Sequence, residues 1–315
     1  MILRHTDRVR VDDISNREGR SDFDVHWPWG RGHLAHGITA VLRVKDEARN
    51  LPWVLPPLID TVQRVVLVDN ESTDGTADVA REVVARLGVE ERVEIVHYPF
   101  TVSRCGSEHL ATPGDSVRSL AYYYNWAFSH ARTSYSMKWD GDMVLTAEGS
   151  ALVADLMWQI ESEPTVVVFL HHPLYIESPS VAYLDLKLKP REPWIFPVGP
   201  DYTFVKGFDW EIRVSPEDVT RITMPEGICF ELKWLDLDEF AHWTDPAEFD
   251  ARRSPRKVRE YAVFHALRRG EVPESVVRIE APPGVHVVDH VRDTWLPTAR
   301  RPLDTGQSAA TVRVP

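Results

Sequence analysis

The sequence predicts an α/β protein whose mostly parallel sheet is flanked by helices. Three short apolar runs rich in β-branched residues, at 38–44, 65–68 and 93–96, have the composition of strands that are buried on both faces. The segments between these runs carry apolar residues at helical spacing. Strands that alternate with helices in this way form right-handed βαβ units, and such units build a parallel sheet.

The first half of the chain follows this alternation element by element. The first strand leads into a polar stretch and then a helix, which we expect to end near Pro56 and Pro57 because proline interrupts helical hydrogen bonding. The second strand closes on Asp69. The helix at 76–87 ends at Gly88, and glycine adopts the left-handed conformation of a helix C-terminus at low cost.

Beyond the third strand the elements are less evenly spaced. The expected elements are a loop at 101–117, helices at 119–131 and 146–160, and strands at 136–139 and 165–170. Past residue 173 the alternation gives way to shorter segments rich in Trp and Pro. A helix is expected to begin at Pro255 and end at Gly270, whereas the segment at 286–290 is expected to be strand or loop.

Composition and charge exclude several classes of protein. Lys and Arg total 36 against 48 Asp and Glu, a formal net charge of −12, so the chain lacks the positive field that draws proteins to nucleic acid. No stretch approaches the roughly 18 consecutive apolar residues of a membrane span. Cys105 and Cys229 are too few for a disulfide framework. We therefore expect a soluble, cytoplasmic protein with no nucleic-acid partner and no integral membrane segment.

Two acidic motifs stand directly after expected strands. Asp69 opens the sequence Asp-Asn-Glu-Ser-Thr-Asp-Gly-Thr, whose capping residues begin the next helix at the sheet edge where α/β proteins bind ligands. Asp140-Gly141-Asp142 follows the strand at 136–139. Two carboxylates separated by one residue can converge on a hard cation, and Gly141 permits a close approach of the backbone. Taken alone, each motif also fits an ordinary turn.

Taken together, the two motifs resemble the GT-A glycosyltransferases of family 2, over roughly residues 37–170. The segments that carry the likeness are 38–50, 65–76 and 136–145. The first of them leads into Lys-Asp-Glu-Ala-Arg-Asn-Leu, which is close to the family's Arg-Asn-Glu-x-x-x-Leu pattern. The resemblance implies a GT-A fold, which is a Rossmann-like, mostly parallel sheet flanked by helices, here with a C-terminal elaboration.

The resemblance also implies roles at individual positions. Asp69 corresponds to the carboxylate that contacts the base or ribose of the donor. Asp140 corresponds to the first acid of the DxD motif, near the ribose and the metal, and Asp142 to the last acid, usually the direct metal ligand. The other residues expected to bind the donor are Arg43, Glu47, Arg118 and Gly141.

These roles imply a metal-dependent glycosyltransferase that moves a sugar from a nucleotide-diphosphate sugar to a small-molecule or soluble acceptor, with inversion. A divalent cation, Mn²⁺ or Mg²⁺, would stabilise the departing diphosphate as a Lewis acid, which suits a chain without a global basic patch. Two alternatives stay open. One is a sugar-nucleotide nucleotidyltransferase, which usually carries a glycine-rich loop after its first strand, and the other is a non-catalytic GT-A domain that binds a nucleotide sugar without turnover.

The catalytic base and the remaining metal ligand are defined less sharply. Four acids are candidates for the base: Asp209, Glu211, Asp236 and Asp238. The strand expected at 229–234 resembles the one that supplies a further metal ligand, which makes Glu231 a candidate and leaves His242 as an alternative. His286 and His290 stand four residues apart, but without a His-Glu-x-x-His motif we reject a zinc hydrolase.

On these grounds the chain divides into three parts. Residues 1–36 show neither a strand period nor a helix period and are expected to form an N-terminal extension. Residues 37–245 are expected to form the GT-A catalytic domain, with a nucleotide-binding half at 37–145 and an acceptor half at 146–245. Residues 246–315 carry a C-terminal helix and tail, which we expect on the acceptor side or as a lid.

Overall fold

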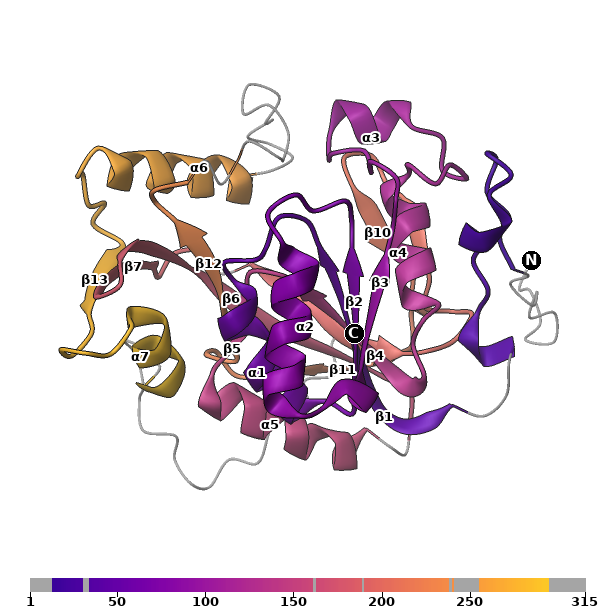
Figure 1. Cartoon of the computed structure of the whole chain (residues 1–315), viewed down its shortest axis with the longest axis horizontal. Helices are drawn as coiled ribbons and strands as arrows, with labels where there is room; N and C mark the ends of the chain where they lie inside the picture. Colours follow the sequence, from indigo (N-terminus) through magenta and orange to yellow (C-terminus); the bar gives the residue numbers. More distant parts are fainter. Residues whose placement is uncertain are drawn as a thin grey trace.

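The computed structural model describes residues 13–30, 34–160, 163–188, 190–237, 240 and 255–294. Within this part of the chain the expected α/β fold is confirmed, because a large mixed sheet carries helices on both faces (Figure 1). The strands are β1 (Ala35–Val44), β2 (Arg64–Asp69), β3 (Val93–His97), β4 (Thr133–Asp140), β5 (Met143–Leu145), β6 (Thr165–Ser178), β7 (Val181–Asp185), β8 (Arg191–Pro197), β9 (Phe204–Lys206), β10 (Glu211–Arg213), β11 (Thr220–Thr223), β12 (Cys229–Trp234) and β13 (Val276–Glu280). The helices are α1 (Leu51–Thr61), α2 (Thr76–Leu87), α3 (Ser107–Ala111), α4 (Leu120–Phe128), α5 (Ala147–Gln159), α6 (Pro255–Arg268) and α7 (Val287–Thr294), with short 3-10 turns at Ser21–Phe23, Pro28–Gly30 and Glu90–Arg92.

The first four long strands have the predicted parallel arrangement. They lie in the order β3-β2-β1-β4, and each neighbouring pair is parallel. The chain therefore leaves β1 toward β2 and β3 on one side and returns on the other side as β4. Open α/β sheets bind ligands at such a reversal, outside the carboxyl ends of the strands. The register aligns Val44 with Asp69 and Arg43 with Asp140, so the acids of both motifs end the two strands that flank β1.

Beyond β4 the sheet continues with antiparallel strands. β8 runs between β4 and the long strand β6, and β7 and β13 complete that side. β12 branches from this path, because it pairs in parallel with β6 and antiparallel with β5. This pairing brings β12 alongside the Asp140-Gly141-Asp142 turn, where the Leu232 N–H donates to the Asp142 carbonyl at 2.8 Å.

The side chains of β1 alternate between two hydrophobic layers. Ala40, Leu42 and Val44 pack with residues of α1, α2 and α5 in one cluster. Val41 packs in a second cluster with α4 and the N-terminal segment. In Figure 1, α1 and α2 lie side by side against the sheet, apart from α4. Arg43 follows the same alternation as Val41, which directs its side chain to the α4 layer.

The polar segment before β1 packs onto α4. Val25 and Trp27 are buried in the same cluster as the aromatic side chains of that helix. The Tyr122 hydroxyl lies 3.0 Å from the carbonyl oxygens of Ile14 and Phe23. At the other end of the chain, β13 joins the main sheet beside β7. The three-part division of the chain stays a prediction.

Some local predictions are wrong, among them the loop expected at 101–117, which contains the helix α3. Helix α1 continues through Pro56 and Pro57, because the buried Leu58 packs in the core and its burial offsets the hydrogen bonds that the prolines cannot donate. The segment at 286–290 is neither strand nor loop, since α7 begins at Val287 and buries an apolar face. None of the helices in the described part of the chain has the length and apolar character that crossing a membrane requires.

Candidate active site

The two acidic motifs and Arg43 meet at the carboxyl ends of β2, β1 and β4. Asp69 and Asp140 lie on either side of β1. Their backbones are therefore about 10 Å apart, which is twice the spacing between neighbouring strands. The Asp69 side chain is largely buried, and its carboxylate accepts the Ser72 N–H at 3.3 Å and lies 3.5 Å from His97 Nδ1. The acids that the sequence predicts for donor binding therefore share one edge of the sheet, at the reversal of strand order.

Arg43 joins β1 to Asp140 at this edge. Its Nη2 donates to Asp140 Oδ1 at 2.5 Å, and its guanidinium stacks on the Tyr124 ring, with Cζ 3.6 Å from the ring centroid. Burial opposes the charged form of Arg43, but the neighbouring Tyr124 and carboxylates raise its pKa above the usual value. The Arg43 side chain is 5% exposed and that of Asp140 is 40% exposed, so Asp140 is the member of this pair that a ligand can reach.

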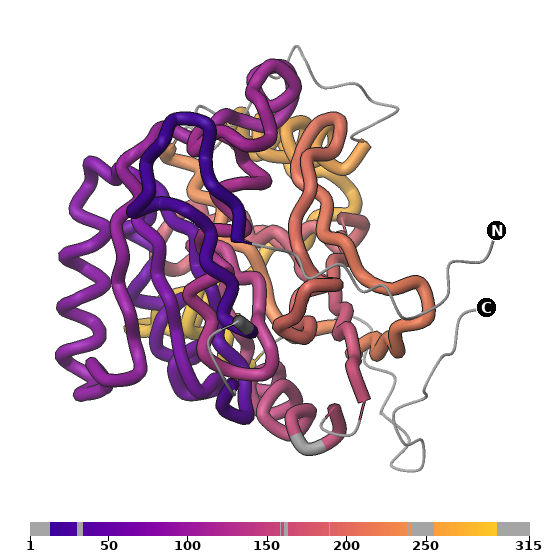
Figure 2. The backbone as a smooth tube through the Cα atoms, turned by 90° about the vertical axis from the view of Figure 1, so that its right-hand side faces the viewer, coloured from indigo at the N-terminus to yellow at the C-terminus, as the bar shows by residue number. Residues whose placement is uncertain are grey.

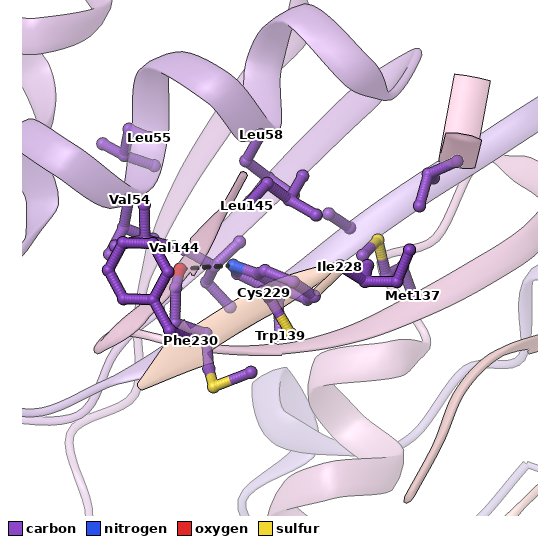
Figure 3. Close-up of a cluster of buried hydrophobic side chains, with 14 of the residues drawn as sticks. Val54, Leu55, Leu58, Met137, Trp139, Val144, Leu145, Ile228, Cys229 and Phe230 are labelled. Carbon is purple, nitrogen blue, oxygen red and sulfur yellow. Dashed lines mark hydrogen bonds between the residues drawn. The ribbon is translucent and has the colours of Figure 1, made fainter. Parts of the chain in front are cut away.

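A hydrogen bond from Trp139 spans the Asp140-Gly141-Asp142 turn. The fully buried indole donates from Nε1 to the Met143 carbonyl at 2.9 Å, across the turn (Figure 3). Figure 3 also shows the indole among side chains of α1, β5 and β12. Because the core encloses the indole on these sides, it holds both ends of the turn and therefore the position of the two carboxylates.

The close approach of the loop after β1 explains the glycine at position 141. A Cβ built on Gly141 would lie 2.7 Å from Glu47 Cγ and 2.9 Å from Val44 Cγ1. Glu47 is itself fixed, because its Oε2 accepts from Asn50 Nδ2 at 2.6 Å and its N–H donates to Thr76 Oγ1 at 2.8 Å. Glu47 and Gly141, which the sequence places separately in donor binding, are thus packed against each other.

Asp142 and Glu231, which are predicted as metal ligands together with Asp140, come together around an ammonium group that the sequence prediction missed. Lys233 Nζ lies 2.9 Å from Asp142 Oδ2 and 2.8 Å from Glu231 Oε1. All three side chains are largely buried, and that of Lys233 is 4% exposed. The available signal was the alternation along β12, which places residues 231 and 233 on the same face of the strand.

A divalent cation does not fit between these carboxylates while Lys233 holds them. Mg²⁺ demands near-octahedral oxygen coordination, whereas the described residues contain no group of three or more His, Cys, Asp or Glu that could hold a metal ion. His242, the alternative predicted ligand, lies outside the described residues.

Burial and charge give the two carboxyl groups different proton affinities. Burial, together with Glu231 and Asp140, raises the pKa of Asp142 to about 7 against the pull of Lys233. Burial also acts to raise the pKa of Glu231, but Lys233 and His171 outweigh it and hold that pKa well below its usual range. Glu231 is therefore the charged partner of the ammonium at neutral pH.

Among the candidate bases, Glu211 faces the Arg43 side of the site. It begins β10, in a β9–β10 hairpin that Figure 2 shows as two adjacent salmon-coloured segments. Burial raises the pKa of its carboxyl, while Lys138, Arg43 and a hydrogen bond from Tyr124 act in the opposite direction. A half-buried carboxyl group with a raised pKa, close enough to Arg43 to interact with it, has the properties of a general base.

Two of the other candidate bases have partners elsewhere, and the third lies outside the described residues. Asp209 precedes β10 and interacts electrostatically with His109 in the helix α3. Asp236 is paired with Arg49 at 2.8 Å, and its side chain is 60% exposed. Asp238 lies outside the described residues. Glu211 is therefore the candidate that the tertiary structure favours.

Of the predicted donor contacts, Arg118 is bonded to the loop after β3, and a further basic group near the site, Lys138, was not predicted. Arg118 is exposed, and its Nη1 donates to the Thr101 carbonyl at 3.4 Å, so its donor role stays a prediction. Lys138, by contrast, is largely buried two residues before Asp140 and donates to Glu192 Oε2 at 3.0 Å. A single lysine in a strand carries no signal in the sequence, because its partner comes from β8.

The solved structures that the chain matches include GT-A glycosyltransferases, the class that the sequence motifs resemble. One is the mannosyltransferase PcManGT from Pyrobaculum calidifontis in complex with GDP-Man and Mn²⁺, at 18% identity over 48% of this chain and 41% of that chain, with a TM-score of 0.31. Another is S. aureus TarS 1–349, at 12% identity over 73% and 72% of the two chains, with a TM-score of 0.35. A third is glucosyl-3-phosphoglycerate synthase from Mycobacterium tuberculosis in complex with Mg²⁺ and UDP, at 13% identity over 45% and 46%, with a TM-score of 0.27.

These likenesses are partial. The chain covers 34% of S. aureus TarS 1–349 in its UDP complex and 21% of S. aureus TarS, which is well under two thirds of their lengths. No protein-family model matches the chain, and no curated protein matches it. The α/β class therefore rests on the sheet topology described above.

Proposed function

We propose that the chain is a glycosyltransferase that moves a sugar from a nucleotide-diphosphate sugar to the hydroxyl group of a soluble acceptor. The observation that carries this proposal is the meeting of Asp69, Arg43 and Asp140 at the reversal of strand order, the edge where open α/β sheets bind nucleotides. In this assignment Asp69 binds the base or ribose, and Asp140 with Gly141 borders the ribose and the diphosphate.

The backbone of this edge supports the proposal. Asp46 and Glu71, in the loops after β1 and β2, have positive φ angles of 57° and 54°, which are uncommon for residues with side chains. Bonds between the two loops hold this conformation, since the Asp46 N–H donates to Ser72 Oγ at 2.9 Å and the Ala48 N–H to Asp74 Oδ2 at 2.9 Å. Backbone strain that the surrounding structure maintains is concentrated at ligand-binding sites.

The proposed reaction is a direct displacement with inversion. The acceptor oxygen attacks the anomeric carbon, its proton passes to the Glu211 carboxylate, and the bond between the anomeric carbon and the diphosphate oxygen breaks. The nucleoside diphosphate leaves with the electron pair of that bond, and its new charge needs a nearby cation. Two sources of that charge are a divalent cation, as the sequence predicts, and the Lys233 ammonium.

Calorimetric titration of UDP-, GDP-, CDP- and TDP-linked sugars tests the donor site. The wild-type protein should bind one nucleotide class, and Asp69→Asn should weaken that binding by about tenfold or more, the usual effect of losing a hydrogen bond to a charged group. Asp155→Asn is the matched control, because Asp155 is exposed on α5. The proposal would be refuted if none of the four nucleotide classes bound, with or without Mn²⁺.

A further inference from the structure

We propose that Lys233 supplies the positive charge that a divalent cation would bring to the donor diphosphate, so that the chain binds its donor without a metal ion. This inference rests on the proposed function of the same edge. It starts from the position of the ammonium, which lies within 2.9 Å of oxygens of both Asp142 and Glu231. These are the two carboxylates that a metal-dependent site would leave for its metal.

Strand pairing places Lys233 beside Asp142. β12 is bonded on both sides, to β5 and to β6, and Glu231 stands opposite Met143. The Leu232 N–H donates to the Asp142 carbonyl at 2.8 Å, which brings Lys233 past the acidic turn. Every residue of β12 is buried, and the Lys233 side chain is 4% exposed, so the ammonium is enclosed by the protein.

Each acid of the Asp140-Gly141-Asp142 motif carries its own basic partner. Arg43 is paired with Asp140 at 2.5 Å, and Lys233 is paired with Asp142 at 2.9 Å. Both basic side chains are at most 5% exposed, so their charges are fixed in position and weakly screened by solvent. Both cations therefore lie behind the carboxylates of the turn and offset the negative charge that an approaching diphosphate would otherwise meet.

Further basic groups pair with two neighbouring acids, Glu192 and Glu260, although the whole chain has a formal net charge of −12. The first turn of α6 supplies Arg256, 2.6 Å from Glu192 Oε1, and Lys257, 3.3 Å from Glu260 Oε2. Glu260 Oε1 in turn lies 3.8 Å from Lys233 Nζ. In our proposal these basic side chains offset the charge of the acids around Lys233, as a metal ion would otherwise do.

Titration with Mn²⁺ alone separates the two sources of charge. We expect wild-type protein to show no stoichiometric Mn²⁺ binding in calorimetry, because the ammonium holds both carboxylates. Lys233→Ala should gain a Mn²⁺ site, because the substitution frees Asp142 and Glu231. Stoichiometric binding of Mn²⁺ to the wild-type protein would overturn the inference, and this measurement does not require any variant to fold.

Donor binding in the presence of EDTA tests the role itself. The nucleotide sugar that binds best should have the same dissociation constant, within about twofold, in EDTA and in Mn²⁺. Lys233→Met, which keeps the packing of the stem, should weaken binding about tenfold or more. Lys187→Met is the control, because the Lys187 side chain is exposed. Circular dichroism checks that each variant folds.

The outcomes distinguish the two proposals. If EDTA abolishes binding to the wild-type protein, or if Lys233→Met binds as tightly as wild type without metal, the inference about Lys233 is wrong while the proposed function stands. If no nucleotide sugar binds under any condition, the proposed function fails and the inference fails with it.

Discussion

Replacing Gly141 with alanine should separate the acidic turn from the loop after β1. The new Cβ would lie 2.7 Å from Glu47 Cγ and 2.9 Å from Val44 Cγ1, well inside the usual contact distance of carbon atoms. Val44 is buried in the core, so Glu47 must move. Its carboxylate then loses the 2.6 Å hydrogen bond from Asn50 Nδ2.

The expected magnitude follows from these two effects. Overpacking by one methyl group costs about 1–3 kcal/mol. A lost hydrogen bond to a charged group costs about 1.5–3 kcal/mol, part of which water restores because Glu47 is half-buried. We therefore expect Gly141→Ala to lower the free energy of unfolding by about 2–3 kcal/mol and to weaken nucleotide-sugar binding about tenfold, since the donor edge shifts with Glu47.

Urea unfolding followed by tryptophan fluorescence measures the change in stability. Gly114→Ala is the matched control, since a Cβ there would meet only Lys206 Cβ at 3.9 Å and should change stability by no more than about 1 kcal/mol. Adding Glu47→Ala to Gly141→Ala removes the overlapping Cγ and should recover part of the loss. A Gly141→Ala protein as stable as wild type, or strictly additive losses in the double variant, would refute this packing argument.

Three further substitutions test the base, the response to acid and the core. Glu211→Gln should retain donor binding but lower turnover about 100-fold or more. Turnover of the wild-type protein should fall as the pH drops through the raised pKa of Glu211, because protonated Glu211 cannot accept the acceptor's proton. A pH–rate profile that falls at the ordinary pKa of glutamate would contradict this role. Burial opposes ionisation of Glu192, but its basic neighbours hold its pKa below 4.5, so its stabilising effect is present above that pH and lost below it. Glu192→Gln should therefore flatten the loss of stability in acid titrations followed by circular dichroism, and an unchanged slope would count against the pair. Trp139→Phe should lower the free energy of unfolding by about 1–3 kcal/mol, because it removes the hydrogen bond to the Met143 carbonyl and leaves a cavity where the larger indole was. Urea unfolding indistinguishable from that of the wild type would show that this hydrogen bond contributes nothing to stability.

The sequence was sufficient for the parallel half of the fold. Apolar runs show where buried strands begin and end, and an acid that closes such a run must lie at the sheet edge. Asp69 and Asp140 could therefore be placed at one edge from the order of residues alone. The sequence predicts that the first helix ends near Pro56, because the helix propensity of proline is poor. The burial of Leu58, which favours a longer helix, depends on the assembled core and cannot be seen in the sequence.

The sequence by itself determined the α/β class, the strand-end positions of the two acidic motifs and the alternation that puts Glu231 and Lys233 on one face of β12. Only the tertiary structure decided which charges meet. Lys233 and Asp142 are 91 residues apart, and they touch because β12 pairs with β5. Periodicity reports which face a side chain occupies within its own strand, whereas the neighbour on that face depends on strand pairing between distant segments. For this reason the ammonium between the predicted metal ligands became visible only in the folded chain.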